Sequence, residues 1–129
     1  MEENEPFGYL LTLDLYGCKE GFCDDLTLCY NFLEDIVVKL EMKEQAPPFI
    51  FRTDGVLYPD KAGLSGWIAL IQSGIQIHTL SPKNFISVDI YSCLKFSRET
   101  MIKFVQDYFQ CKKVEMNYME RGVKYNEIQ

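Results

Sequence analysis

Three apolar segments follow one another closely in the middle of the chain, and this arrangement limits the fold more than any other feature. They span about residues 65–72, 75–80 and 85–93, so that only two and four residues separate them. Connections this short cannot carry a crossover, and neighbouring strands joined by them must pair antiparallel. We therefore predict an antiparallel meander with tight turns at Ser73-Gly74 and at residues 81–84.

The flanking sequence predicts two helices and three further strands. Apolar residues recur at helical spacing from Asp24 or Asp25 to about Met42, and again over residues 97–109, where Ser97 is the expected N-cap. Alternation of apolar and polar residues indicates strands at about residues 9–16, 49–52 and 113–119. The order βαββββαβ predicts an α+β fold, a two-layer sandwich whose antiparallel sheet carries both helices on one face.

Length, charge and cysteine content exclude several classes of function. A chain of 129 residues with 47% hydrophobic residues suits one domain, residues 1–129. The formal net charge of −6 argues against a nucleic-acid partner. The N-terminus is acidic and no apolar run approaches the roughly 20 residues that span a bilayer, so we expect a cytoplasmic protein without a membrane partner. The five cysteines match neither a disulfide framework nor a zinc motif, and we expect reduced thiols and no metal site.

The expected turns determine which side chains share a face of the sheet. A turn centred on Ser73-Gly74 pairs Ala69 with His78, and a tight second turn pairs His78 with Ser87. One face is then aliphatic and lies under the helices. The opposite face carries the candidate reactive groups together with several apolar side chains: Ser65, Trp67, Ala69, Ile71, Ser73, Gln76, His78, Ser87, Asp89, Tyr91 and Cys93.

That second face is too apolar to stay in water, so we expect a second copy of the chain to cover it by two-fold symmetry, forming a homodimer through the non-helical face. Cys93 is expected to return to the neighbourhood of residues 72 and 73. A serine in this turn is either an ordinary hairpin residue or, where the turn is strained, a nucleophile that acts on its own backbone.

Several short elements, in this order, resemble the prokaryotic S-adenosylmethionine decarboxylase family, whose members cleave themselves to make a pyruvoyl cofactor. The likeness runs from about Tyr9 to Cys93, with a weaker echo at residues 120–122. Its elements are Leu13–Cys18, Gly63–Gly66, Ser73 with Ile77-His78-Thr79, and Val88–Cys93.

The resemblance implies that the chain cuts itself between Gln72 and Ser73. In such a reaction Ser73 Oγ attacks the carbonyl carbon of Gln72, and elimination from the resulting ester leaves a pyruvoyl group generated from Ser73. Its keto group forms a Schiff base with an amino-acid-type substrate and acts as the electron sink for loss of carbon dioxide. By the same resemblance, His78 assists proton removal during processing, Ser65 hydrogen-bonds the intermediate, and Cys93 supplies a proton after decarboxylation.

The chain departs from the family pattern around the cleavage site and beyond the histidine. Gln72 and Gly74 stand where the family usually has glutamate and histidine, and Leu80 and Pro82 stand where it has an adenine-stacking tryptophan and a ribose-binding glutamate. Tyr58 lies near the position of the family's other adenine-stacking aromatic residue. The candidate substrate-binding residues are Tyr58, Leu80 and Asp89.

Three functions follow from this mixture of matches and departures. The first is decarboxylation of S-adenosylmethionine for polyamine (spermidine) biosynthesis. The second is the same machinery acting on arginine or ornithine, whose cationic end would meet Asp60 or Asp89. The third is a homologue that no longer cleaves and serves as a structural or regulatory partner.

Overall fold

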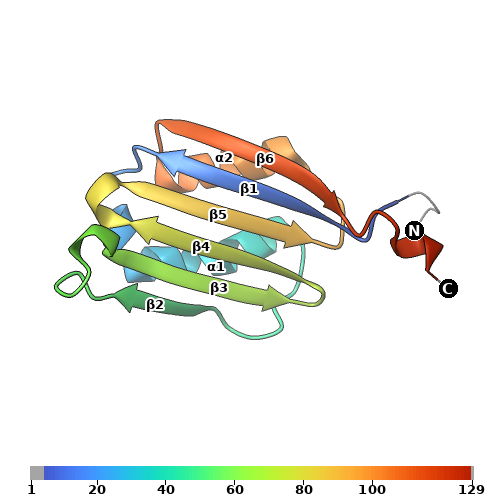
Figure 1. Ribbon diagram of the computed structural model, residues 1–129, viewed down its shortest axis with the longest axis horizontal. Coiled ribbons are helices and arrows are strands. Elements are labelled where there is room, and N and C mark those ends of the chain that lie inside the picture. Colours follow the sequence, from blue (N-terminus) through green and yellow to red (C-terminus); the bar gives the residue numbers. More distant parts are fainter. Residues whose placement is uncertain (1–4, 129) are drawn as a thin grey trace.

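The computed structural model describes residues 5–128, so most of the acidic N-terminal segment lies outside the described residues. Within them, a 6-stranded sheet has the order β2-β3-β4-β5-β1-β6, and every neighbouring pair is antiparallel (Figure 1). The strands are β1 (Gly8–Tyr16), β2 (Phe49–Thr53), β3 (Gly63–Leu70), β4 (Ser73–Leu80), β5 (Phe85–Ser92) and β6 (Lys113–Arg121).

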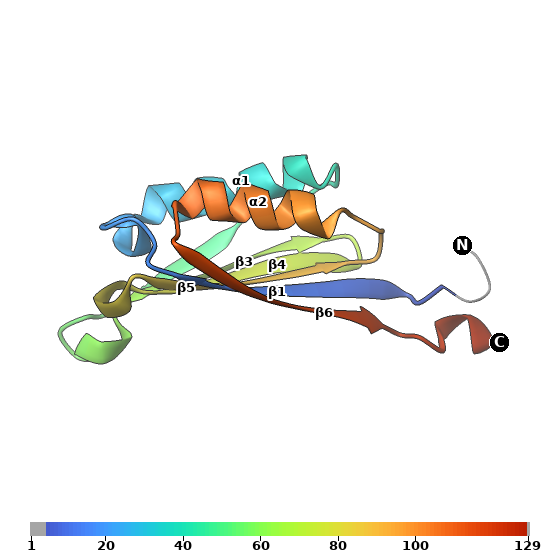
Figure 2. The ribbon, with the colours of Figure 1, turned by 90° about the horizontal axis from the view of Figure 1, so that it is seen from above.

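Two helices, α1 (Leu26–Lys39) and α2 (Arg98–Phe109), lie side by side on one face of this sheet (Figure 2). Both begin at the expected caps, because Asp25 Oδ1 accepts a hydrogen bond from Leu28 N at 3.0 Å and Ser97 Oγ accepts one from Thr100 N at 3.2 Å. The α+β sandwich with both helices on one face, predicted from the sequence, is confirmed.

The core lies between the helices and the aliphatic face of the sheet. Alternate residues of the central strands are buried there, as the alternation predicts, and they pack against apolar residues of both helices. The fully buried members include Leu11, Leu13 and Leu15 of β1, Ile77 of β4, Ile86, Val88 and Ile90 of β5, Phe32, Leu33 and Ile36 of α1, and Val105 and Phe109 of α2. Each such side chain contributes about 1.5–3 kcal/mol, so this layer holds the sheet rigid beneath its open face.

The hairpin between β3 and β4 differs from the expected one. Its loop is Ile71-Gln72, and β4 already begins at Ser73, so the predicted turn at Ser73-Gly74 is wrong by two residues. His78 therefore pairs with Ser65, whereas the sequence predicted Ala69. The physical reason is that Gln72 takes the left-handed position of the turn, with φ 57°, and leaves Gly74 within the strand.

The shift preserves the alternation of the paired residues, so almost every side chain keeps its predicted face. The next pairing, of His78 with Ser87 between β4 and β5, is confirmed. Ser73 is the exception. As the first residue of β4 it belongs to the alternating series of the buried Ile75 and Ile77, whereas His78 belongs to the series that faces away from the helices.

Candidate active site

The open face of the sheet carries the polar candidates in two adjacent rows that run across the strands. The strand register aligns the first row as Phe51, Ser65, His78, Ser87 and Asp14, and the second as Phe49, Trp67, Gln76, Asp89 and Thr12. We call these the histidine row and the tryptophan row. They give the open face a polar centre with an aromatic border on β2 and β3.

His78 has a hydrogen-bonding partner on each ring nitrogen. Its Nδ1 lies 2.9 Å from Ser65 Oγ on β3, and its Nε2 lies 2.6 Å from Gln76 Nε2 on its own strand. The prediction placed Ser65 and His78 on one face, and the structure brings them into direct contact. It did not identify Gln76 as a partner, although the spacing of two residues along a strand puts both side chains on the same face.

Two glycines of the element Gly63–Gly66 allow β3 to approach its neighbours around Ser65. A Cβ on Gly63, whose φ is +155°, would lie 2.0 Å from the carbonyl oxygen of Thr79. A Cβ on Gly66 would lie 2.9 Å from the carbonyl oxygen of Phe49. Any larger residue at these positions would clash with the backbone of a neighbouring strand.

Thr79 fixes the backbone next to His78, a role that the sequence pattern did not predict. Its buried hydroxyl accepts a hydrogen bond from Leu64 N at 2.8 Å and donates one to the carbonyl oxygen of Cys23 at 2.6 Å. The available signal was a polar residue that directly follows Ile75 and Ile77 in the helix-facing series of β4. Because both bonds are buried, they are costly to break, and they hold β3 and β4 in register beside the histidine.

Ser73 and Cys93 form a second contact at the opposite end of β4. The backbone N–H of Cys93 donates to Ser73 Oγ at 2.9 Å, and Cys93 Sγ lies 4.0 Å from the carbonyl oxygen of Ile71. The expected return of Cys93 to this hairpin is confirmed. Gln72, directly before Ser73, holds a left-handed backbone conformation that costs a non-glycine residue about 1–2 kcal/mol.

A groove of about 560 Å³ runs over the open face beside Ser73. Its lining includes Trp67, Gln76 and Asp89 of the tryptophan row, together with Tyr91 and Arg121. Burial raises the pKa of Asp89 above its ordinary value, and the nearby His78 opposes this effect. The Arg121 guanidinium lies 5.3 Å from the centre of the Tyr91 ring. The groove thus offers one carboxyl group and one cation within an aromatic wall.

The two contacts lie far apart within one chain. Ser73 and His78 are separated by five residues of strand, which corresponds to about 17 Å. Leu80 pairs with Phe85 at the far end of β4, and Tyr58 is exposed in the loop that reaches the same end, where Ser81 N donates to Ala62 O at 2.8 Å. Of the candidate substrate-binding residues, only Asp89 lines the groove beside Ser73.

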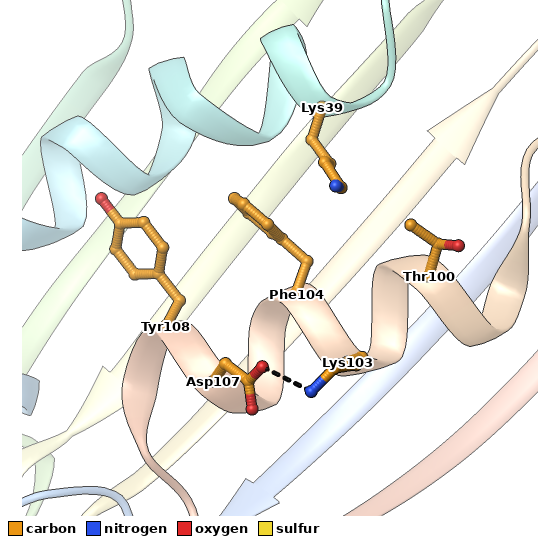
Figure 3. A pocket seen from close by; sticks show the side chains of 6 residues that line it. All are labelled: Lys39, Thr100, Lys103, Phe104, Asp107 and Tyr108. Atoms are coloured by element: carbon orange, nitrogen blue, oxygen red, sulfur yellow. Dashed lines mark hydrogen bonds and ion pairs between the residues drawn. The ribbon is translucent and has the colours of Figure 1, made fainter.

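A second pocket, of about 430 Å³, lies between the two helices on the opposite side of the molecule (Figure 3). It is lined by Lys39, Thr100, Lys103, Phe104, Asp107 and Tyr108. Lys103 and Asp107 form an ion pair at 2.9 Å across one turn of α2. None of the candidate catalytic residues borders this pocket, so it is separate from the site on the open face.

The cysteines are free thiols: Cys18, Cys23, Cys29 and Cys111 are buried, and Cys93 is partly exposed. A hydrogen bond between Cys18 and Cys23 raises the pKa of Cys18 and lowers that of Cys23.

Within residues 5–128, no group of three or more His, Cys, Asp or Glu side chains is arranged to hold a metal ion. In the same part of the chain, no helix has the length and apolar character needed to cross a membrane.

Comparison with known proteins finds relatives that are similar over most of the chain. The S-adenosylmethionine decarboxylase proenzyme of Clostridium botulinum strain Langeland is 28% identical over 116 residues, which cover 89% of this chain and 94% of that protein. The S-adenosylmethionine decarboxylase proenzyme of Pyrococcus furiosus is 24% identical over 122 residues, covering 93% and 82%.

The fold also has a counterpart among solved structures. The crystal structure of the adenosylmethionine decarboxylase from Aquifex aeolicus superimposes with a TM-score of 0.78 at 21% identity, covering 92% of each chain. Finally, residues 9–122 match the S-adenosylmethionine decarboxylase family. This match covers most of the chain and includes every candidate catalytic residue, and we conclude that the chain belongs to the S-adenosylmethionine decarboxylase family of carboxy-lyases.

Proposed function

We propose that this chain cleaves itself between Gln72 and Ser73 and uses the resulting pyruvoyl group to decarboxylate S-adenosylmethionine for polyamine (spermidine) biosynthesis. The observation that carries the proposal is the position of Ser73. It follows a residue in a left-handed conformation, in a two-residue loop, and it borders a groove of about 560 Å³ on the open face.

The cleavage converts an amide into an ester and then breaks the ester. Ser73 Oγ loses its proton and bonds to the carbonyl carbon of Gln72, while the peptide C–N bond breaks and the nitrogen of residue 73 takes up a proton. Loss of the Cα proton of residue 73 then expels the Gln72 carboxylate from Cβ. Water hydrolyses the remaining enamine, through its imine tautomer, to ammonia and the pyruvoyl group. Opening the loop relieves the backbone strain at Gln72, which favours the reaction.

The residues around position 73 fit this chemistry. The Cys93 N–H holds the Ser73 hydroxyl toward the end of β5, and the Cys93 thiol, 4.0 Å from the Ile71 carbonyl oxygen, lies beside the hairpin, where it can supply a proton. The pyruvoyl group, once formed, supplies an electron sink for loss of carbon dioxide.

A second copy of the chain would bring Ser65 and His78 to this site. A two-fold axis near the middle of β4 would place the Ser73 end of one strand against the His78 end of its partner. The open face is suited to such packing, because Phe49 and Phe51 lie 5.7 and 5.9 Å from the Trp67 ring and all three are about half exposed. The partner's Ser65 and His78 would then assist processing, with the partner's Tyr58 and Leu80 beside the substrate.

A specific observation also favours a second candidate function. Asp89 lines the groove beside Ser73, whereas Leu80 and Pro82 provide neither an aromatic ring for adenine nor a carboxylate for ribose. A carboxylate in the groove suits the cationic end of arginine or ornithine. The same machinery would then decarboxylate one of these amino acids.

Denaturing mass spectrometry tests the cleavage. We expect two fragments, residues 1–72 and 73–129, with the second blocked at its N-terminus by pyruvoyl. Ser73→Ala is the matched control and stays intact. A wild-type chain that also stays intact after prolonged incubation contradicts the proposal and leaves a non-cleaving structural or regulatory homologue.

Release of labelled carbon dioxide identifies the substrate. We expect release from carboxyl-labelled S-adenosylmethionine that depends on Ser73. Release from arginine or ornithine alone would contradict the first function and support the second.

A further inference from the structure

Gln76 is the described partner of the His78 ring on the side away from Ser65. Its amide nitrogen lies 2.6 Å from His78 Nε2, and Ser65 Oγ lies 2.9 Å from Nδ1. An amide nitrogen has no lone pair to offer and can only donate. With the amide in this orientation, Nε2 of His78 must therefore accept the hydrogen bond from Gln76. The proton of the neutral histidine ring then resides on Nδ1.

This tautomer determines how Ser65 can be used. Because Nδ1–H donates to Ser65 Oγ, the hydroxyl proton of Ser65 stays available for a third group. In the opposite tautomer Nδ1 would be an acceptor, and Ser65 would direct its own proton to the ring. Only the first arrangement leaves Ser65 able to donate to a developing oxyanion.

The strand register constrains the Gln76 side chain. Trp67 stands opposite Gln76 on β3 and Asp89 stands opposite it on β5, so the amide has a neighbour on each side along the tryptophan row. Gln76 also lines the groove beside Ser73. It is thus the residue through which the groove and the His78–Ser65 contact are connected.

We propose that Gln76 is a positioning residue that holds His78 in the Nδ1–H tautomer and thereby keeps the Ser65 hydroxyl free to donate to the reaction intermediate. The consequence for processing rests on the proposed function, whereas the tautomer itself does not. Gln76 acts through His78 and has no direct part in the chemistry.

The chain has one histidine, so the tautomer can be read without ambiguity. We would record nitrogen-15 NMR spectra of the full chain, labelled at histidine, at a pH where the ring is neutral. We expect Nδ1 to carry the proton in the wild type. In Gln76→Leu we expect a shift toward the Nε2–H form that free histidine prefers.

Gln106→Leu is the matched control, because Gln106 lies on α2, on the other side of the sheet. It should leave the histidine spectrum unchanged. A wild-type ring protonated at Nε2 would overturn the proposal, and so would a Gln76→Leu spectrum identical to that of the wild type. Backbone amide spectra of both variants verify that the fold is retained.

Cleavage rates separate this proposal from the proposed function. We expect Gln76→Leu to cleave at least about tenfold more slowly than the wild type, since a wrong imidazole tautomer is costly in serine chemistry. A wild-type chain that never cleaves but carries the proton on Nδ1 contradicts the proposed function and supports the assignment of Gln76. Normal cleavage by Gln76→Leu with an altered tautomer overturns the positioning role.

Discussion

The backbone N–H of Cys93 donates a hydrogen bond of 2.9 Å to Ser73 Oγ, so the contact between these two residues does not involve the sulfur atom. The cleavage step and the thiol can therefore be separated by mutation. We predict that Cys93→Ala still cleaves within a few-fold of the wild-type rate, because the N–H donor remains. Its decarboxylation should fall by about 10²-fold or more, the usual contribution of a positioned proton donor.

Intact mass and carbon dioxide release measure the two rates on the same sample. Equal losses of cleavage and turnover would show that the thiol is needed for processing. Unchanged turnover would remove Cys93 from the reaction.

Gln72→Gly should relax the hairpin. Glycine removes the strain of the left-handed conformation, about 1–2 kcal/mol. It also lowers the free energy of unfolding by about 0.5–1 kcal/mol, because the unfolded chain gains conformational freedom. We predict a net gain of about 0.5–1 kcal/mol in the free energy of unfolding, measured by denaturant titration of the uncleavable Ser73→Ala chain. In the cleavable chain, self-cleavage should slow by about two- to fivefold. Faster cleavage would show that the strain at Gln72 does not drive the reaction.

Asp89→Asn should stabilise the fold while weakening the site. Burial raises the pKa of Asp89, so the folded state prefers the neutral carboxyl group. The stability due to this preference is fully present below the ordinary pKa of aspartate. It is lost as the pH rises through the pKa that Asp89 has in the folded state. We therefore predict a higher Tm for Asp89→Asn at neutral pH and little change near pH 3.

The same variant tests the role of Asp89 in the groove. If its carboxylate holds a cationic substrate, KM should rise about tenfold, as expected for loss of a hydrogen bond between charged groups. Ser87→Ala, in the neighbouring histidine row on β5, is the matched control for the fold. An unchanged KM would exclude Asp89 from substrate binding.

Trp67 provides a built-in probe of the open face, because it is the chain's single tryptophan and 46% of it is exposed in one copy. We predict that its emission is blue-shifted and protected from acrylamide at high protein concentration, and becomes exposed on dilution. Sedimentation over the same range should show a dimer dissociating to monomers.

A charge on this face should prevent assembly. Trp67→Glu is expected to be monomeric and to cleave at least about tenfold more slowly, because the partner's His78 is then missing. Val38→Glu, on the exposed side of α1, is the control for an added charge. A monomeric variant that cleaves normally would show that one chain suffices.

Gly63→Ala should be among the most damaging single substitutions. The added Cβ would lie 2.0 Å from the Thr79 carbonyl oxygen, in a backbone conformation that already disfavours alanine. We predict a loss of about 3 kcal/mol or more, or an insoluble protein. Gly21→Ala is the comparison, because its φ is +89° but no atom lies within 4 Å of the new Cβ. It should cost only about 1–2 kcal/mol.

Much of the fold could be predicted because it depends on local rules. The caps Asp25 and Ser97 and the alternation of apolar residues in the strands each follow from neighbouring sequence. The register between β4 and β5 followed as well, because the connection lies at residues 81–84, where the sequence predicted it. The family resemblance extended this reasoning to Ser65, Ser73, His78 and Cys93, which the structure places in two contacting pairs.

The details of the site depend on contacts that no local rule contains. Ser-Gly favours a turn more strongly than Ile-Gln, yet the loop is Ile71-Gln72, because β4 starts at Ser73 with its hydroxyl bonded to the end of β5. The bond between Gln76 and His78 depends on side-chain rotamers. The separation of about 17 Å between Ser73 and His78 follows only after the loop has been located.

The order of the strands has a consequence for a chain cut between Gln72 and Ser73, where the loop meets β4. The first fragment would contain β1, β2, β3 and α1, and the second would contain β4, β5, β6 and α2. In the sheet, however, β1 of the first fragment lies between β5 and β6 of the second, and β4 pairs with β3. The two polypeptides would be interleaved in one hydrogen-bonded sheet, so neither could dissociate without unfolding the other. After cleavage, the two fragments would therefore stay together as one folded protein.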